Sequence, residues 1–432
     1  METKKPKRSD PFHPLPRGAS AAFSRLAAAA RVRPHVPALL QLIWEEGDIS
    51  RAELAKRTGL SRSTVSEIVG ELLATHLVAE VGTGESQGGR RPIVLRFQYD
   101  GFGIVGIDMG ATHVGVAVTN LRGEVSSWEE RSHPVREDPR GTQALVFELV
   151  ERSLRRAGQD LKRLLAIGLA VPSPVDPRRP DHLSEVVMPA WAGRSLVKPL
   201  HDRFQLPVVV DNDANLGALA EHWWGAGRGV DDSVYIKVAT GVGSGHIIGG
   251  RIYRGASGTA GEIGHLAIDT QGPVCICGLR GCLATFIGTP ALVARTLTLL
   301  PKHPRSLLAH KKIDITAIED AALAGDPLGL QVVEEAADRL GIAVAGMLNL
   351  MNPAVVAIGG SLARLGELLI RPLRESVRRR SWVSSVAATK IVASELGVRN
   401  VAVGASTLVL QNALEDLRFF PTGTARHGRP HA

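Results

Sequence analysis

Residues 261–283 of the chain read GEIGHLAIDTQGPVCICGLRGCL. This stretch contains His265 and all three cysteines of the protein, Cys275, Cys277 and Cys282. An odd, closely spaced set of cysteines does not make a disulfide framework, whereas one imidazole and three thiolates can complete the tetrahedral shell of a Zn²⁺ ion. Because four protein ligands leave no open position, we predict a structural zinc site in a reducing compartment. The alternative is a set of free cysteines beside a surface histidine.

The predicted zinc site also affects the residues just before it. Gly278 and Gly281 let the chain fold closely around the ion, and the ion would fix the loop at 261–265. We therefore expect Glu262 to face a ligand pocket.

Strand and helix patterns surround this motif over residues 101–410. Short β-branched runs are typical of buried strands, and helical patterns such as 328–350 separate several of them. This predicts an α/β region with a mixed or parallel sheet covered by helices. The strand-like runs are 103–118, 165–171, 207–210, 233–238 and 354–358.

Two glycine-rich turns follow strands in this region, at 108–112 and 240–245. Glycine lets the backbone approach a phosphate closely, and two such turns in one chain are more specific than one. We predict two nucleotide-phosphate loops and a duplicated half. The residues concerned are Asp108, Gly110, Thr112, Thr240, Gly241 and Gly243.

The sequence DNDAN at 211–215 lies between the two turns. Asn212 and Asp213 offer hydrogen-bond donors and acceptors for neighbouring sugar hydroxyls. Asp213 could also act as the general base in phosphoryl transfer to a hydroxyl. The alternative is a turn that only caps a helix over 216–223.

A compact helical unit precedes the α/β region, over residues 35–98. Apolar residues recur at helical spacing over 36–44, and Ser50 and Ser61 can cap two further helices. The helix over 62–76 has the layout of a recognition helix, whose first turn enters the major groove of DNA. Its outward residues are Arg62, Ser63, Thr64 and Ser66.

A predicted hairpin over 77–97 completes this unit, and its tip carries Arg90 and Arg91. Guanidinium groups at such a tip suit phosphates or the minor groove. We therefore predict a winged helix-turn-helix that binds double-stranded DNA. The alternative is a three-helix protein-interaction module.

The composition fits a DNA-binding protein with no membrane role. The 432 residues carry a formal net charge of +8, and no apolar run approaches the roughly 20 residues that span a bilayer. No secretory signal precedes the helical unit, so we expect a cytoplasmic protein. Residues 1–34 hold eight Lys or Arg against Glu2 and Asp10, which predicts a disordered basic arm for a polyanion, or a solubilising tail. The stretch at 411–432 is expected to be a flexible tail.

Together these motifs resemble the ROK family, named for repressors, open reading frames and sugar kinases, over about residues 34–410. The resemblance implies a winged helix-turn-helix over 35–98, like that of the xylose-type and N-acetylglucosamine-type repressors. It then implies a two-lobed, actin/hexokinase-like (ribonuclease H-like) α/β domain. Lobe 1 is expected over 101–220, and lobe 2, with the zinc site, over 221–410; the C-terminal helices could return to lobe 1.

The resemblance also assigns residues to ligands. Sugar-contacting positions are Asn212, Asp213, Glu262 and His265, and zinc ligands are His265, Cys275, Cys277 and Cys282. Nucleotide-phosphate positions are Asp108, Gly110, Thr112, Thr240, Gly241 and Gly243, and adenosine-side positions are Asn352, Pro353, Gly359, Gly360 and Ser361. Asp213 would be the catalytic base, and ATP with Mg²⁺ a cofactor, only if the protein is a kinase.

Three positions depart from the family pattern. Ala284 stands two residues after the last cysteine, where the family usually has a sugar-binding glutamate, so one hydroxyl acceptor is missing. Ser173 replaces a usual glycine, and His113 stands where a lysine often follows the threonine. The first departure argues against efficient kinase activity.

The resemblance implies a sugar-responsive transcriptional regulator, expected to be a repressor of carbohydrate-metabolism genes. A sugar or sugar phosphate in the cleft would change the affinity for operator DNA, and paired half-sites require a homodimer or homotetramer. One alternative is an ATP-dependent, glucokinase-like sugar kinase that also binds DNA. Another is a DNA-binding protein whose cleft is vestigial.

Overall fold

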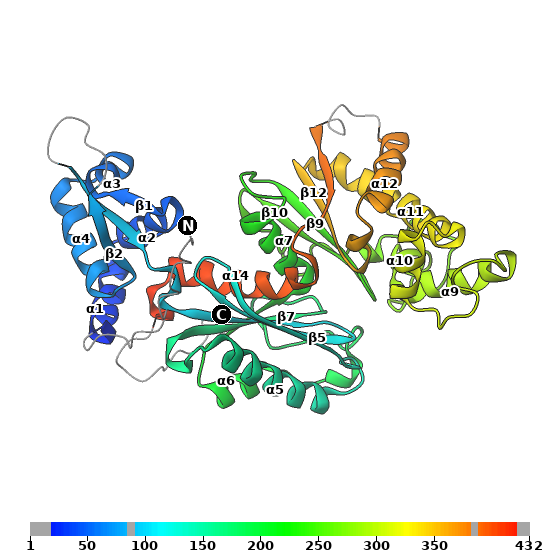
Figure 1. The fold of residues 1–432 in the computed structure, drawn as a ribbon, viewed down its shortest axis with the longest axis horizontal. Coiled ribbons are helices and arrows are strands. Elements are labelled where there is room, and N and C mark those ends of the chain that lie inside the picture. The colour runs from blue at the N-terminus through cyan, green and yellow to red at the C-terminus, as the bar shows by residue number, and fades with distance from the viewer. Residues whose placement is uncertain (1–18, 84–90, 382–387, 421–432) are drawn as a thin grey trace, which may run out of the picture.

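The computed structural model describes residues 19–83, 91–381 and 388–420, which form a small N-terminal unit and two larger lobes (Figure 1). Each of the three parts is built on its own β-sheet. Within the described residues, no helix is long and apolar enough to cross a membrane.

The N-terminal unit is a winged helix-turn-helix with a three-stranded antiparallel sheet of order β1-β3-β2. Ser50 caps α3 by accepting a hydrogen bond from the backbone N–H of Glu53, at 3.2 Å. Ser61 caps α4 by accepting one from the N–H of Thr64, at 3.1 Å. Both predicted caps are therefore confirmed. The elements are α2 (His35–Glu46), β1 (Asp48–Ser50), α3 (Arg51–Thr58), α4 (Arg62–Ala74), β2 (Val78–Thr83) and β3 (Ile93–Phe97).

Helix α1 (Ala19–Val32) corrects the prediction of a disordered arm through residue 34. Its Phe23 is buried and stacks on Phe420, with ring centroids 5.3 Å apart. The prediction of a flexible tail from residue 411 is also wrong as far as Phe420, which is itself buried. The physical reason is the same at both ends, because apolar side chains near the two termini bury one another. Residues 1–18 and 421–432 lie outside the described residues.

Lobe 1 has a five-stranded sheet of order β6-β5-β4-β7-β8, in which β4 runs antiparallel to β5 and parallel to β7. Helices α5 and α6 cover one face, and α14 covers the other (Figure 1). A Cβ atom on Gly106 or Gly168 would lie 2.0 Å from a carbonyl oxygen of α14, so these glycines permit the close approach. The elements are β4 (Gly103–Met109), β5 (His113–Asn120), β6 (Val125–Ser132), α5 (Pro139–Ala157), β7 (Leu164–Val171), α6 (Val197–Phe204), β8 (Val208–Asn212) and α14 (Asn400–Glu415).

Lobe 2 repeats this topology with the order β11-β10-β9-β12-β13. The repeated order confirms the duplicated half, and each glycine-rich turn is the hairpin after the first strand of its lobe. Helix α7 covers one face of the sheet, and α11 packs on the other. The elements are α7 (Asp213–Trp224), β9 (Ser233–Val238), β10 (Val242–Ile248), β11 (Arg251–Ile252), α8 (Ala284–Ile287), α9 (Thr289–Leu299), α10 (Ile315–Leu323), α11 (Pro327–Met351), β12 (Val355–Gly360), α12 (Glu367–Arg380) and β13 (Lys390–Ala393).

Helices α7 and α14 pack against each other between the two sheets. A Cβ atom on Gly404 of α14 would lie 1.8 Å from the carbonyl oxygen of Leu216 in α7. The two helices therefore approach each other closely, and a shift of one would displace the other.

Candidate functional site

The His265 and cysteine side chains form a cluster with the geometry of a metal site. The four candidate ligand atoms, one from each of His265, Cys275, Cys277 and Cys282, all lie within 4.8 Å of one another. The Sγ atoms of Cys277 and Cys282 are 3.7 Å apart, and Cys275 Sγ is 3.5 Å from His265 Nδ1. Zn–S bonds of about 2.3 Å in a tetrahedron place sulfur atoms about 3.8 Å apart, so the cluster fits a tetrahedral ion. The structure thus brings the predicted metal ligands together.

The other nitrogen of His265 points toward Glu262. Its Nε2 lies 3.7 Å from Glu262 Oε2. Burial, with a smaller contribution from the negative charge of Asp213, raises the pKa of Glu262. Glu262 therefore lies near both His265 and Asp213, and the expectation that it faces a ligand pocket stays a prediction.

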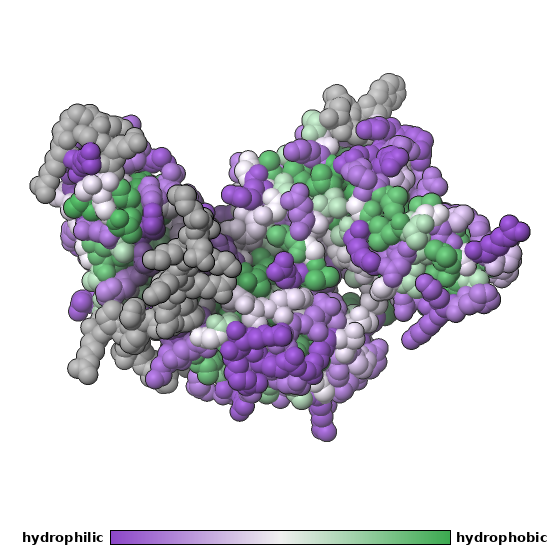
Figure 2. Space-filling model, in the orientation of Figure 1, coloured by the Kyte–Doolittle hydropathy of each residue, from purple (hydrophilic) through white to green (hydrophobic). Residues whose placement is uncertain are grey.

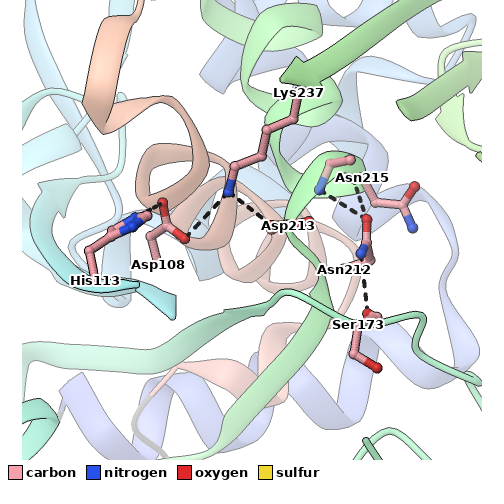
Figure 3. Close-up of polar contacts among 8 residues, drawn as sticks. Asp108, His113, Ser173, Asn212, Asp213, Asn215 and Lys237 are labelled. Carbon is pink, nitrogen blue, oxygen red and sulfur yellow. Dashed lines mark hydrogen bonds and ion pairs between the residues drawn. The ribbon is translucent and has the colours of Figure 1, made fainter. Parts of the chain in front are cut away.

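Asn212 begins α7 and caps it. Its Oδ1 accepts hydrogen bonds from the N–H groups of Ala214 and Asn215, at 2.9 and 3.2 Å, while Nδ2 donates to the carbonyl of Ser173 at 3.1 Å (Figure 3). The present contacts of Asn212 are therefore those of a helix cap, which is the alternative interpretation of this sequence. The cap also fixes the backbone of the neighbouring Asp213 at the start of α7.

Four charged or titratable side chains meet between the lobes, three of them from the two sheets and one from the start of α7 (Figure 3). Lys237 of β9 places its Nζ 2.8 Å from Asp213 Oδ2 and 3.9 Å from Asp108 Oδ1. His113 Nε2 lies 3.3 Å from the other oxygen of Asp108. Burial works against charge on Lys237, but the two carboxylates raise its pKa above the ordinary value. Burial likewise opposes charge on Asp108, yet Lys237 and His113 lower its pKa.

Sequence reasoning missed Lys237. It is only 8% exposed, in a strand whose residues are all buried. The available signal was a single lysine within the apolar run SVYIKV, because a lysine buried in a central strand needs a negative partner.

The glycines predicted to hold a nucleotide lie around this cluster. In the β4–β5 turn, a Cβ atom on Gly110 would lie 2.2 Å from the ring of His113, so the imidazole covers this turn. Gly241, in the β9–β10 turn, has open space around it. Gly359 and Gly360 end β12, where a Cβ atom would collide with Tyr235 or with the backbone of Val238. The last two glycines therefore have a packing role. Thr112 and Thr240 belong to the same two hairpin turns, whereas Gly243 lies at the start of β10, opposite Lys237.

The predicted recognition helix presents its polar residues outward. Arg62, Ser63 and Ser66 are exposed, while Val65, Ile68, Val69 and Leu72 of the same helix are buried. Thr64 is half-buried, and its hydroxyl lies 2.8 Å from the capping hydroxyl of Ser61. Arg91 is exposed next to the wing strand, whereas Arg90 lies outside the described residues.

A tryptophan cluster joins the DNA-binding unit to the lobes, and sequence reasoning missed it. Trp44 of α2 packs on Trp223 and Trp224 at the end of α7, with ring centroids 5.1 and 6.0 Å away. Trp44 Nε1 donates to the carbonyl of Leu121 at 2.7 Å, and Trp224 Nε1 donates to Thr407 Oγ1 of α14 at 2.7 Å. The sequence shows two adjacent large aromatic residues, Trp223 and Trp224, at the end of a helix, but nothing in it indicates that Trp44 is their partner.

A winged helix-turn-helix joined to two lobes of repeated topology defines a DNA-binding protein of the actin/hexokinase-like class. The ROK family model matches residues 104–412, and a winged helix-turn-helix DNA-binding model matches residues 37–78. The chain belongs to the ROK family, which confirms the predicted family and fold class.

Among curated relatives, a xylose repressor of Caldicellulosiruptor bescii is 35% identical over 380 residues, which cover 87% of this chain and 95% of that protein. The N-acetylglucosamine repressor of Escherichia coli O157:H7 is 30% identical and covers 88% of this chain and 93% of its own length.

Two solved structures share the fold. A ROK family transcriptional regulator described as a homologue of the E. coli MLC protein is 28% identical, with a TM-score of 0.75 over 89% of this chain and 96% of that one. A ROK family glucokinase from Streptomyces griseus, in complex with glucose and AMPPNP, is 30% identical, with a TM-score of 0.66 over 72% of this chain and 99% of that one. The glucokinase match covers less of this chain than the regulator match does.

Proposed function

We propose that this protein is a transcriptional repressor of carbohydrate-metabolism genes, whose affinity for operator DNA changes when a sugar binds between its lobes. The observation that carries this proposal is the direct packing of Trp44, in the DNA-binding unit, on Trp223 and Trp224 of α7, the helix that begins with Asp213. Similarity to xylose and N-acetylglucosamine repressors over nearly their whole lengths supports it.

The cleft offers the chemistry that a sugar requires. Asp213 and Glu262 provide carboxylate oxygens, and the amide of Asn212 provides a donor, so neighbouring hydroxyls can be held by paired hydrogen bonds. His265 would bind the metal through Nδ1 and face the sugar through Nε2. Xylose and N-acetylglucosamine, the sugars in the names of the relatives, are the first ligands to test.

The Cys₃His cluster would hold Zn²⁺ as a structural ion. Its four ligands leave no open position, so the ion would stabilise the loop that carries Glu262 and would not contact the sugar. The thiols are close together and partly or fully buried, and burial together with the neighbouring thiols raises the pKa of Cys282 to about 12. A bound cation would relieve this cost by stabilising the thiolates.

Helix α7 would couple the two sites. It has 12 residues, so it spans about 18 Å, from Asp213 in the cleft to the tryptophan cluster on α2. A sugar that draws the lobes together would move α7, and with it Trp223 and Trp224 against Trp44. In a homodimer or homotetramer, this movement would change the spacing of the two α4 helices and hence the fit to paired half-sites.

DNA binding by α4 can be tested with a duplex selected by the purified protein from a random library. Arg62→Ala should weaken binding to this duplex by about tenfold or more, because a side chain that reaches a base or phosphate is lost. Arg155→Ala, at an exposed position on α5, is the matched control and should leave binding unchanged. Equal binding by all three proteins would contradict the assignment of α4 as the recognition helix.

A further inference from the structure

The position of Lys237 bears on which ligands the cleft accepts. Lys237 lies on the face of β9 that α7 covers, and Tyr235 on the same face packs against Gly217 and Ala218 of that helix. From there its ammonium group reaches Asp213 at 2.8 Å and faces Asp108 at 3.9 Å (Figure 3). Lys237 therefore makes charge contacts with both lobes and with the start of α7.

Both carboxylates depend on this ammonium group. Asp108 is 2% exposed, and its Oδ1 accepts no hydrogen bond from any described residue, so the positive charge of Lys237 is what faces that oxygen. Asp213 forms its close ion pair with the same Nζ atom. A buried carboxylate, Asp108, and a partly buried one, Asp213, approach one cation, which resembles the donor set of a bound metal with the ammonium in the place of the ion.

The nucleotide and magnesium ion that the kinases of this fold require do not fit this arrangement. Phosphoryl transfer needs a cation that neutralises the phosphates and a carboxylate free to accept the proton of the attacking hydroxyl. Here Lys237 already pairs with Asp213 and neutralises Asp108. The ring of His113 also covers Gly110, where the backbone would have to approach a phosphate.

We propose that Lys237 is a built-in counter-ion that replaces the metal–nucleotide complex and makes the cleft a site for a neutral, unphosphorylated sugar alone. A sugar phosphate would bring further negative charge toward Asp108, Asp213 and Glu262, three carboxylates that Lys237, with His113 beside Asp108, only partly balances. This inference rests on the proposed function only in taking the cleft as the ligand site.

The test is calorimetry on the full-length protein without DNA. Wild type should bind N-acetylglucosamine at least about tenfold more tightly than N-acetylglucosamine 6-phosphate, or xylose more tightly than xylose 5-phosphate, and should show no heat with Mg·AMPPNP. Lys237→Met, which keeps the length of the side chain but removes its charge, should gain affinity for Mn²⁺ by about tenfold or more, because two carboxylates then lack a cation. Lys237→Arg should not gain it.

Several results would overturn the inference. Wild type that binds Mg·AMPPNP, or that binds the sugar phosphate more tightly than the sugar, would contradict it without any variant. If Lys237→Met does not fold, as judged by circular dichroism, the wild-type titrations with the sugar, its phosphate and Mg·AMPPNP still test the inference. Loss of Mg·AMPPNP binding in Lys237→Met would show that Lys237 is a phosphate ligand. The proposed function fails separately, if a bound sugar leaves DNA affinity unchanged.

Discussion

The two ends of α7 differ in kind. At its N-terminal end, Asn212, Asp213 and Lys237 form a polar cluster in which charge and hydrogen bonds determine what can bind. At its C-terminal end, Trp223 and Trp224 meet Trp44 through broad aromatic contacts. This difference fits the proposed division of roles, in which the polar end would select a ligand and the aromatic end would transmit movement to the DNA-binding unit.

The DNA-binding unit and lobe 1 are joined by one continuous cluster of buried apolar residues. Figure 2 shows a mainly hydrophilic visible face on lobe 1, whereas apolar residues gather on parts of the DNA-binding unit and of lobe 2. Gly217 and Gly404 keep α7 close to β9 and to α14, and any Cβ atom there would collide with a neighbour. Helix α7 is therefore held on both sides along its length, which favours its movement as one body.

The largest expected effect concerns the metal cluster beside the polar end. Cys282→Ser removes one of four ligands, so bound zinc should fall from one per chain to near zero and the free energy of unfolding should fall by more than about 4 kcal/mol. Metal analysis and urea unfolding measure the two quantities. Arg280→Ala changes an exposed residue of the same loop and should alter neither. If Cys282→Ser kept its metal and its stability, the proposal of a structural zinc site would be contradicted.

A substitution at the polar end should affect ligand binding alone. Asp213→Asn removes a charged acceptor, and sugar binding should weaken by about 1.5–3 kcal/mol, measured by calorimetry. Operator affinity in the absence of sugar should stay the same. Asp202→Asn, at an exposed position on α6, is the control. If Asp213→Asn lowered operator affinity as much as sugar affinity, the two ends of α7 would not have separate roles.

A substitution at the aromatic end should leave sugar affinity nearly unchanged and weaken the effect of sugar on operator affinity. Trp223→Ala leaves the cleft intact, so calorimetry should give sugar affinity within about twofold of wild type. The effect of sugar on operator affinity should shrink by about 1–2 kcal/mol, since the coupling contact is lost. Trp223→Phe keeps an aromatic contact and should retain most of the effect. Normal coupling in Trp223→Ala would exclude the tryptophan cluster as the connection.

The smallest effect comes from His246 on β10. Burial lowers the pKa of His246 to about 4, whereas an unfolded histidine titrates near 6.5. The unfolded chain therefore binds more protons between these two values, and stability should fall as pH is lowered through 6.5, by about 1 kcal/mol at pH 5.5. His246→Gln should remove this part of the pH dependence of unfolding, while the exposed His310→Gln should not. An unchanged pH dependence in His246→Gln would be the contradicting result.

The sequence predicted the local features of this molecule well. Serine caps, the hairpin glycines and the spacing of Cys275, Cys277 and Cys282 each depend on a few neighbouring residues, and the structure contains them. The features it did not predict depend on residues far apart in the chain. The contact of Lys237 with Asp108 forms only because the two lobes pack together, and the contact of Trp44 with Trp223 forms only because the DNA-binding unit packs on the lobes. Helix α1 was missed because its partner, Phe420, lies at the other end of the chain.

The most direct test of the central claim is the affinity of the wild-type protein for its selected operator duplex, measured by fluorescence anisotropy with and without saturating sugar. Coupling through α7 predicts a change in affinity of about fivefold or more. An unchanged affinity, under conditions where calorimetry shows that the sugar is bound, would contradict the account.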